Sequence, residues 1–142
     1  MRVSDVLRNK GNTVQTVQPG ATVRELLGSL AEHNIGAAVV SADGQTIVGI
    51  VSERDVVRQL HQRGADLLEV TVADIMTADV RTSTPEEALD DLRATMTKHR
   101  IRHVPVVQDG RIAGLVSIGD VVKSTISELE TEREHLVGYI QS

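Results

Sequence analysis

The feature of this sequence that most constrains its fold is an internal repeat. Four residues of the first half recur 66 positions later: Pro19 and Pro85, His33 and His99, Ile35 and Ile101, and Gly44 and Gly110. The segment Gly49–Val57 matches Gly114–Val122 at an offset of 65, and Val3–Leu7 matches Val72–Met76. Because several anchors agree in register with one short gap, we interpret the chain as two copies of one supersecondary unit.

The first copy has the pattern of a strand, a helix, two strands and a second helix. Thr22–Glu25 has the spacing of a capping box, which starts a helix. Asp43 and Gly44 form a typical turn between two strands. The expected elements are a strand near Thr13–Val17, a helix from Thr22, strands Ile35–Val40 and Ile47–Val51, and a helix from Ser52 to about Arg63.

The second copy repeats this order. The expected elements are a strand near Val80–Thr82, a helix that starts at Thr84–Glu87, strands Val104–Val107 and Ile112–Val116, and a helix from Ser117. A unit of about 60 residues is marginally stable alone. We therefore expect an α/β fold in which two β-α-β-β-α repeats pack sheet to sheet about a pseudo-twofold axis, with two related clefts where they join.

The chain divides into three parts on this interpretation. Residues 1–65 form the first repeat, residues 70–127 the second, and residues 128–142 a helical extension. An apolar stripe continues from Val122 to Ile140 along the extended helix. This stripe would pack either on its own repeat or on a second copy of the chain.

The composition excludes several classes of function. The chain has no Cys, which excludes disulfides, thiolate metal sites and a Cys nucleophile. Its one aromatic residue is Tyr139, so it has no platform on which bases of single-stranded nucleic acid could stack. The net charge of −5 also disfavours nucleic-acid binding. Because no apolar run approaches the roughly 20 residues of a membrane span, we expect a soluble cytoplasmic protein. We also expect no metal site.

A doubled motif connects the chain to a known family. The pattern Gly-apolar-apolar-Ser-x-x-Asp occurs at Gly49–Asp55 and Gly114–Asp120, and it resembles the signature of the cystathionine-β-synthase (CBS) domain. Ile101–Val106 and Asp74–Thr77 are also similar to that family. The resemblance spans about Val3 to Ile126, so the chain looks like a stand-alone CBS pair, or Bateman module. It implies an adenine-nucleotide sensor that forms a homodimer; AMP is the commonest ligand type, beside ADP, ATP, NAD(H) and S-adenosylmethionine.

Ser52 and Asp55, with their repeat equivalents Ser117 and Asp120, are the main candidate ligand-binding residues. Each Ser lies at a strand-to-helix junction, where backbone N–H groups and the helix dipole favour a phosphate. Each Asp lies one turn into the helix, where its carboxylate can accept hydrogen bonds from a ribose diol. The alternative is that Ser-x-x-Asp is a capping box that only stabilises the helix.

We expect the two clefts to differ. Arg100, Arg102 and His103 form a basic cluster in the second repeat, and the resemblance implies that Arg102 and His103 reach nucleotide phosphates; a solvated strand end is the alternative. In the first repeat, Gly36 lacks bulk, which would let a base approach the backbone closely. The other candidate ligand-binding residues are Thr16, Val17, Ile35, Ala37, Ala38, Arg54, Thr82, Val104, Pro105 and Ile118. Val17, Ile35 or Val104 would clamp the faces of the base.

The function expected from these residues is regulatory binding rather than catalysis. AMP would occupy one cleft, and NAD(H), ATP or ADP the other. Binding would shift the angle between the halves or the dimer packing, and an effector protein, unidentified from the sequence, would read the change. We expect no catalytic residue, since the chain has no P-loop, GxGxxG or nucleophile elbow. Two alternatives remain: a small nucleotide-processing enzyme with His103 as general base, and a structural dimerisation module with vestigial clefts.

Overall fold

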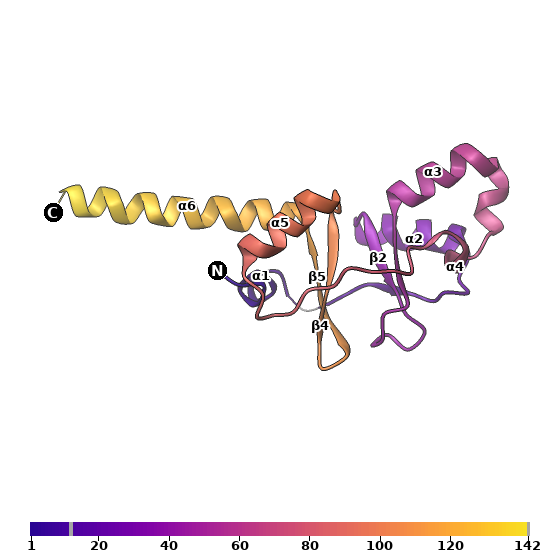
Figure 1. Ribbon diagram of the computed structural model, residues 1–142. Helices are drawn as coiled ribbons and strands as arrows, with labels where there is room; N and C mark the ends of the chain where they lie inside the picture. Colours follow the sequence, from indigo (N-terminus) through magenta and orange to yellow (C-terminus); the bar gives the residue numbers. More distant parts are fainter. Residues whose placement is uncertain (12, 142) are drawn as a thin grey trace.

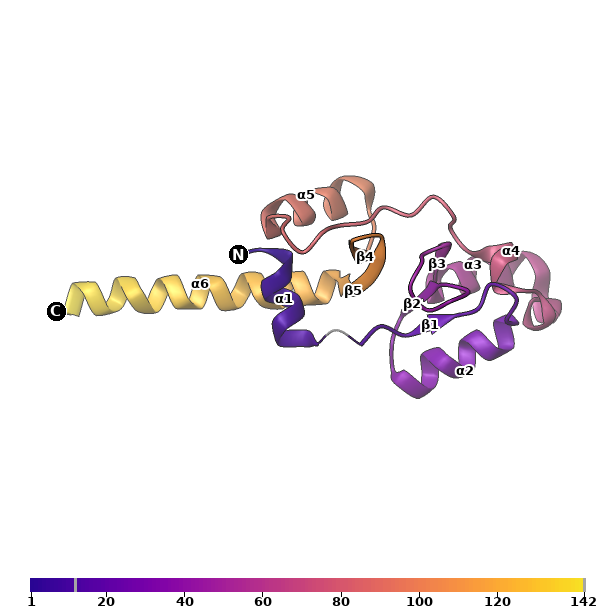
Figure 2. The same ribbon diagram turned by 90° about the horizontal axis from the view of Figure 1, so that it is seen from below.

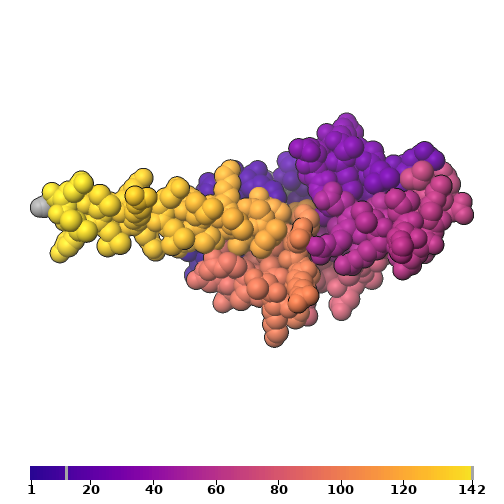
Figure 3. All heavy atoms as spheres, turned by 90° about the horizontal axis from the view of Figure 1, so that it is seen from above, coloured from indigo at the N-terminus to yellow at the C-terminus, as the bar shows by residue number. Residues whose placement is uncertain are grey.

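The computed structural model describes residues 1–11 and 13–141 as a mixed α/β fold with two separate sheets (Figure 1). The two repeats lie side by side, and the last helix extends away from both of them (Figures 1 and 2). In the space-filling view this helix is a rod that projects from the body of the molecule (Figure 3). Within the described residues, no helix has the length and apolar character to cross a membrane.

The first repeat has the expected order of elements. Its sheet has the strand order β1-β2-β3, with β1 parallel and β3 antiparallel to β2. The cap expected at Thr22 is present, since its hydroxyl accepts a hydrogen bond from the Glu25 N–H at 3.2 Å. The elements are β1 (Thr16–Val17), α2 (Val23–His33), β2 (Ala37–Val40), β3 (Gly49–Ser52) and α3 (Glu53–Arg63), followed by the 3-10 helix η1 (Gly64–Glu69).

The second repeat follows the same plan, with its first strand reduced to one residue. Its elements are α4 (Val72–Ile75), α5 (Leu89–His99), β4 (His103–Gln108), β5 (Arg111–Ser117) and α6 (Ile118–Gln141). The strand predicted at Val80–Thr82 is wrong: Ser83 forms a single parallel bridge with Val106, where the first repeat pairs Val17 with Val40. Val80 and Arg81 line a cavity instead of joining the ladder.

The leading helix of each repeat packs into the core of the other repeat. Val3 and Leu7 of α1 (Val3–Lys10) are buried in the core of the second repeat. Val72 and Ile75 of α4 are buried in the core of the first. The ranges 1–65 and 70–127 are therefore not two separately closed cores, because each core needs a helix from the other range.

Backbone hydrogen bonds fix this crossing in the same way at both ends. The Val3 N–H donates to the Glu87 carbonyl at 3.0 Å, just before α5. The Val72 N–H donates to the Ala21 carbonyl at 2.8 Å, just before α2. Each leading helix is thus tied to the start of the following helix in the other repeat.

Gly49 and Gly114, the first residues of the doubled motif, make room for the leading helices. A Cβ at Gly49 would lie 2.5 Å from Met76 Sδ, and a Cβ at Gly114 would lie 2.5 Å from Leu7 Cδ2. A side chain at either position would overlap the packed residue, so that residue would have to shift, and glycine avoids this cost. The glycine of the motif is therefore explained by packing rather than by ligand binding.

The sheets also bury their second faces. Ala38 and Val40 of β2 belong to the first core, so strand alternation places Ala37 and Val39 on the opposite face. Ala37 and Val39 are nevertheless only 1% and 0% exposed. Pro105, the repeat equivalent of Val39, is buried as well. These buried second faces agree with sheet-to-sheet packing of the two repeats.

Helix α6 leaves the body of the molecule after its first turns. Val121 is its buried residue, and Thr125 accepts a hydrogen bond from Arg93 of α5 at 2.8 Å. Beyond that point the helix exposes large apolar side chains: Ile126, Leu129, Leu136, Val137, Tyr139 and Ile140. The outer half of the stripe therefore does not pack on its own repeat.

Candidate functional site

A cavity of about 1100 Å³ opens where the two repeats meet. Its wall comes mainly from the start of α3, the stretch Thr77–Arg81 after α4, and the turn from α5 into β4, with Gly36, Ala37, Ile50 and Ile118 beside them. Small-molecule pockets commonly have volumes of about 300–1,000 Å³, so this cavity has room for a small organic ligand. We call it the Asp55 cleft.

Ser52 and Asp55 form a capping box at the start of α3. The Ser52 N–H and hydroxyl donate to Asp55 Oδ2 at 2.8 and 3.1 Å, and the Asp55 N–H donates back to Ser52 Oγ at 3.4 Å. The capping role considered from the sequence is therefore present. Both side chains also line the cleft, and these bonds leave Asp55 Oδ1 able to accept hydrogen bonds from a ligand.

The Asp55 cleft is basic although the whole chain carries a net charge of −5. Five arginines line it: Arg54, Arg58, Arg81, Arg100 and Arg102. Among residues 1–11 and 13–141, none of these arginines forms an ion pair with an acidic side chain. Unpaired guanidinium groups gathered at one cavity favour an anionic ligand.

The two histidines of the cleft add little charge at neutral pH. Desolvation lowers the pKa of His103, and the nearby charge of Lys10 lowers it further, against a smaller opposing effect of nearby carboxylates. Desolvation, with the charges of Arg81 and Lys98, lowers the pKa of His99. In the part of the chain that the structure describes, histidines and acidic residues form no group that could hold a metal ion.

The equivalent motif at the start of α6 has different surroundings. The Ser117 N–H donates to Asp120 Oδ2 at 2.8 Å, and the Asp120 N–H donates to Ser117 Oγ at 3.1 Å. Lys10 Nζ, however, also donates to Asp120 Oδ2, at 2.6 Å, and to the Leu115 carbonyl, at 2.7 Å. Burial raises the pKa of Asp120, but the hydrogen bonds from Lys10 and Ser117 outweigh it, so the pKa is lowered. We call this group the Asp120 site.

The structure brings one part of the predicted site together and separates the rest. The predicted residues that line the Asp55 cleft are Gly36, Ala37, Ser52, Arg54, Asp55, Arg100, Arg102, His103 and Ile118. The apolar candidates Val17, Ile35, Ala38 and Val104 pack in the two cores instead. Pro105 is buried, Thr16 lies half-buried in β1, Thr82 is exposed beside Arg81, and Ser117 and Asp120 lie at the Asp120 site.

Sequence reasoning missed several residues of the cleft wall. Arg58 follows Asp55 by three residues in α3, and this spacing, which puts both on one helix face, could have revealed it. Asp79, Val80 and Arg81 reach the cleft because the chain crosses from α4 back to the second repeat at this point. No local pattern in the sequence marks that crossing.

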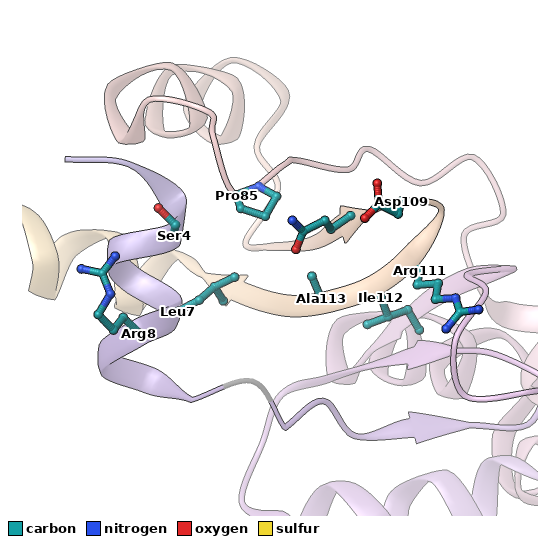
Figure 4. Close-up of a pocket in the computed structure, with 9 residues that line it drawn as sticks. Ser4, Leu7, Arg8, Pro85, Asp109, Arg111, Ile112 and Ala113 are labelled. Carbon is teal, nitrogen blue, oxygen red and sulfur yellow. The ribbon is translucent and has the colours of Figure 1, made fainter.

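A second cavity, of about 840 Å³, lies between α1 and the β4–β5 hairpin (Figure 4). Leu7 and Ala113 line its middle, and Arg8 and Arg111 lie toward its two ends. None of the ligand-binding residues predicted from the sequence lines it. The Asp55 cleft is therefore the candidate functional site.

Comparisons with known proteins show the family and the fold to which this chain is similar. The family model of the CBS domain matches residues 3–62 and 72–126. The mitochondrial CBS domain-containing protein CBSX3 of Arabidopsis thaliana is 37% identical, over 98% of this chain and 71% of that protein. The crystal structure of the CBS-domain containing protein ATU1752 from Agrobacterium tumefaciens has a TM-score of 0.84 at 44% identity, covering 88% of this chain and 99% of that one. The CBS domain pair of protein MJ0100, solved in complex with 5-methylthioadenosine and S-adenosyl-L-methionine, has a TM-score of 0.78 at 28% identity, covering 88% of this chain and 99% of that one.

Proposed function

This chain belongs to the CBS-domain family, and we propose that it is a regulatory module whose Asp55 cleft binds an adenosine nucleotide, AMP foremost. One observation carries the proposal: a carboxylate at the start of a helix shares a cavity with five arginines that have no acidic partner among the described residues. A nucleotide offers the matching groups, since its ribose has two adjacent hydroxyl donors and its phosphate is anionic.

Asp55 and the start of α3 would hold the sugar and the phosphate. Asp55 Oδ2 is used by the cap, so Oδ1 would accept the ribose hydroxyls. The first backbone N–H groups of α3, a helix of 11 residues, favour an anion nearby. The arginines would add charge-assisted hydrogen bonds, which are stronger than neutral ones.

The base would lie against aliphatic side chains and backbone. Ile50, Val80 and Ile101 line the cleft, and the single aromatic residue, Tyr139, lies near the end of α6. At Gly36, a Cβ would lie only 3.3 Å from Glu53 Oε1, so a larger residue there would narrow the cleft. Base recognition would depend on backbone groups more than on stacking.

Ligands of a related CBS pair support an adenosine compound. The MJ0100 pair binds 5-methylthioadenosine and S-adenosyl-L-methionine, both of which contain adenosine. The arginines of the Asp55 cleft favour a phosphorylated form here. AMP satisfies both conditions, and the cavity volume also leaves room for ADP, ATP or NAD(H).

Binding would act on the arrangement of the two repeats. The wall of the cleft comes from α3 of the first repeat and from the α5–β4 turn of the second. A ligand that contacts both sides stabilises the angle between the two repeats at which it binds most tightly. It can shift that angle only because its affinity differs between the two arrangements. An effector protein would then read the change.

A second copy of the chain would cover the exposed stripe of α6. Two series of residues recur at intervals of seven: Val122, Leu129 and Leu136, and Ile126, Arg133 and Ile140. This heptad pattern is typical of a helix that packs against another helix. Glu132 and Glu134 flank Arg133, so an identical helix supplies both the apolar seam and carboxylates for the one cation within it.

Isothermal titration calorimetry with AMP, ADP, ATP, NADH, S-adenosylmethionine and adenosine tests the ligand. We expect AMP to bind and Asp55→Asn to weaken that binding. Arg24→Gln should bind AMP as the parent does, because Arg24 does not line the cleft and pairs with Glu69. Mass spectrometry of the nucleotides after incubation separates binding from turnover. Absence of heat with every compound, or product formation, would contradict the proposal.

Analytical ultracentrifugation tests the homodimer. Leu129→Glu puts a charge in the centre of the seam and should shift the chain to monomer. Ser127→Glu adds the same charge outside the two heptad series and should leave the dimer intact. A monomeric parent chain, or a dimeric Leu129→Glu variant, would exclude α6 as the dimer interface.

A further inference from the structure

The carboxylate of Asp120 is already occupied by a cation of the same chain. Lys10 Nζ lies 2.6 Å from Asp120 Oδ2 and 2.7 Å from the Leu115 carbonyl. The two side chains are 37% and 22% exposed, so the pair is partly shielded from water. The Asp55 carboxylate has no such cation within the described residues.

The position of Lys10 is fixed by the fold. It is the last residue of α1, and Val3 and Leu7 of this helix are buried in the second core. The helix therefore carries the ammonium group to the start of α6 without needing a ligand to order it. The C-terminal end of a helix is also a favourable place for a cation.

Lys10 bonds Oδ2, the oxygen that the cap also uses, so a ribose at the Asp120 site would have to bond Oδ1 of a carboxylate whose charge this ammonium group already neutralises. Its hydroxyls are neutral donors and add no ion-pair attraction, whereas Lys10 brings a full positive charge to the carboxylate. The same 69-residue offset that relates Val3 to Val72 relates Lys10 to Asp79. Asp79 lines the Asp55 cleft and cannot compete for a carboxylate. The two aspartates therefore differ in the charge beside them.

We propose that Lys10 is a specificity-determining residue that reserves Asp120 against the ribose of a nucleotide, so that each chain binds one adenosine nucleotide and not two. The proposal rests on the proposed function of the Asp55 cleft. It changes the expectation of one nucleotide in each cleft, because a carboxylate neutralised by Lys10 attracts ribose hydroxyls less than the carboxylate of Asp55 does.

Native mass spectrometry and calorimetry of the full chain with AMP test this role. The parent chain should bind one equivalent and Lys10→Met two, while Lys10→Arg, which keeps the cation, should bind one. Adding Asp120→Asn to Lys10→Met should remove the second equivalent. Arg8→Met is the matched control, since Arg8 lies on the same helix but pairs with Asp5; it should bind one equivalent. Lys10→Gln replaces Lys10→Met if thermal melting shows that the latter is unfolded.

The outcomes separate this proposal from the one on which it rests. Two equivalents in the parent chain, or one in both Lys10→Met and Lys10→Gln, would overturn the role of Lys10 and leave the Asp55 cleft as the nucleotide site. A parent chain that binds no AMP would contradict the Asp55 cleft. In that case a gain of one equivalent in Lys10→Met that depends on Asp120 still supports the role of Lys10, and no gain overturns it.

Discussion

The Asp55 cleft and the Asp120 site have the same backbone and different charge arrangements. In both, the Ser N–H donates to Oδ2 of the Asp at 2.8 Å. Around Asp55 the cations are arginines without acidic partners, whereas Lys10 is bonded to the Asp120 carboxylate itself. One motif therefore gives an open site in one repeat and an occupied one in the other.

The difference shows that the motif fixes the backbone and that its neighbours decide the chemistry. The Glu53 N–H donates to the Gly36 carbonyl at 2.9 Å, and the Ile118 N–H donates to the Arg102 carbonyl at 2.8 Å, which is the same bond in the two repeats. The side chains at these equivalent positions are unlike in size and charge. A duplicated CBS motif alone thus does not predict two equivalent ligand sites.

The largest expected effect separates the two aspartates directly. Asp55→Asn removes a charged acceptor from the ribose, which costs about 1.5–3 kcal/mol, or about tenfold to a hundredfold in Kd for AMP. Asp120→Asn should leave the Kd within about twofold, because Asp120 does not line the occupied cleft. Calorimetry of both variants measures the difference. Equal losses of affinity would mean that the two sites are functionally alike.

The next effect tests whether the two motif glycines have the same packing role in the two repeats. Gly49→Ala and Gly114→Ala would each force a Cβ against a packed side chain at 2.5 Å. Overpacking of this kind costs about 1–3 kcal/mol, so both variants should lower the free energy of unfolding by similar amounts in urea denaturation. Gly28→Ala, where a Cβ would meet no atom within 4 Å, is the control. A neutral result at either position would break the likeness of the two repeats.

A smaller effect concerns the phosphate. The arginines of the Asp55 cleft should make AMP bind about tenfold more tightly than adenosine, a difference of about 1.4 kcal/mol. Because the interaction is between charges, the preference should shrink as ionic strength rises. Titrations with both ligands at low and high salt measure it. Equal affinities at low salt would remove the arginines from ligand binding.

The smallest effect is a pH dependence at the Asp120 site. The pKa of Asp120 is lower in the folded chain than its ordinary value, because hydrogen bonds from Lys10 and Ser117 outweigh burial. Its contribution to the free energy of unfolding is therefore present above the ordinary pKa and is lost as pH falls through the lowered one. A partly exposed ion pair contributes about 0.2–1 kcal/mol. Between pH 7 and pH 3, Asp120→Asn should lose less stability than the parent, and identical pH profiles would show that the ion pair contributes nothing.

Local signals in the sequence predicted most of the fold. Caps, turns and alternating strands are encoded within a few residues, so Thr22 and Gly44 marked their elements correctly. The strand near Val80–Thr82 was wrong because that segment crosses between repeats, and its residues face the cavity instead of a strand. Crossings of this kind depend on contacts between distant segments, which no local pattern records.

Most charged residues predicted for the candidate site line the cleft, whereas the three apolar residues expected to clamp the base do not. Asp55, Arg100 and Arg102 line the cleft as predicted. A cluster of basic residues stands out in a chain that is acidic as a whole, so it indicates a binding site. Val17 and Val104 were proposed to clamp the base, but both pack in cores. A valine beside a motif has the same pattern whether it faces a ligand or the interior.

The crossing of the leading helices has a consequence for the origin of the chain. A single repeat on its own would lack the leading helix that completes its core. Its own leading helix would have no core to pack against, and its apolar face would be exposed. Two identical single-repeat chains can satisfy both needs by exchanging these helices, as in a domain-swapped dimer. The present chain has the architecture of such a dimer, fused into one polypeptide through Gly64–Val70. Fusion also freed the two sites to diverge, because identical subunits could not have carried Lys10 at one site and Asp79 at the other.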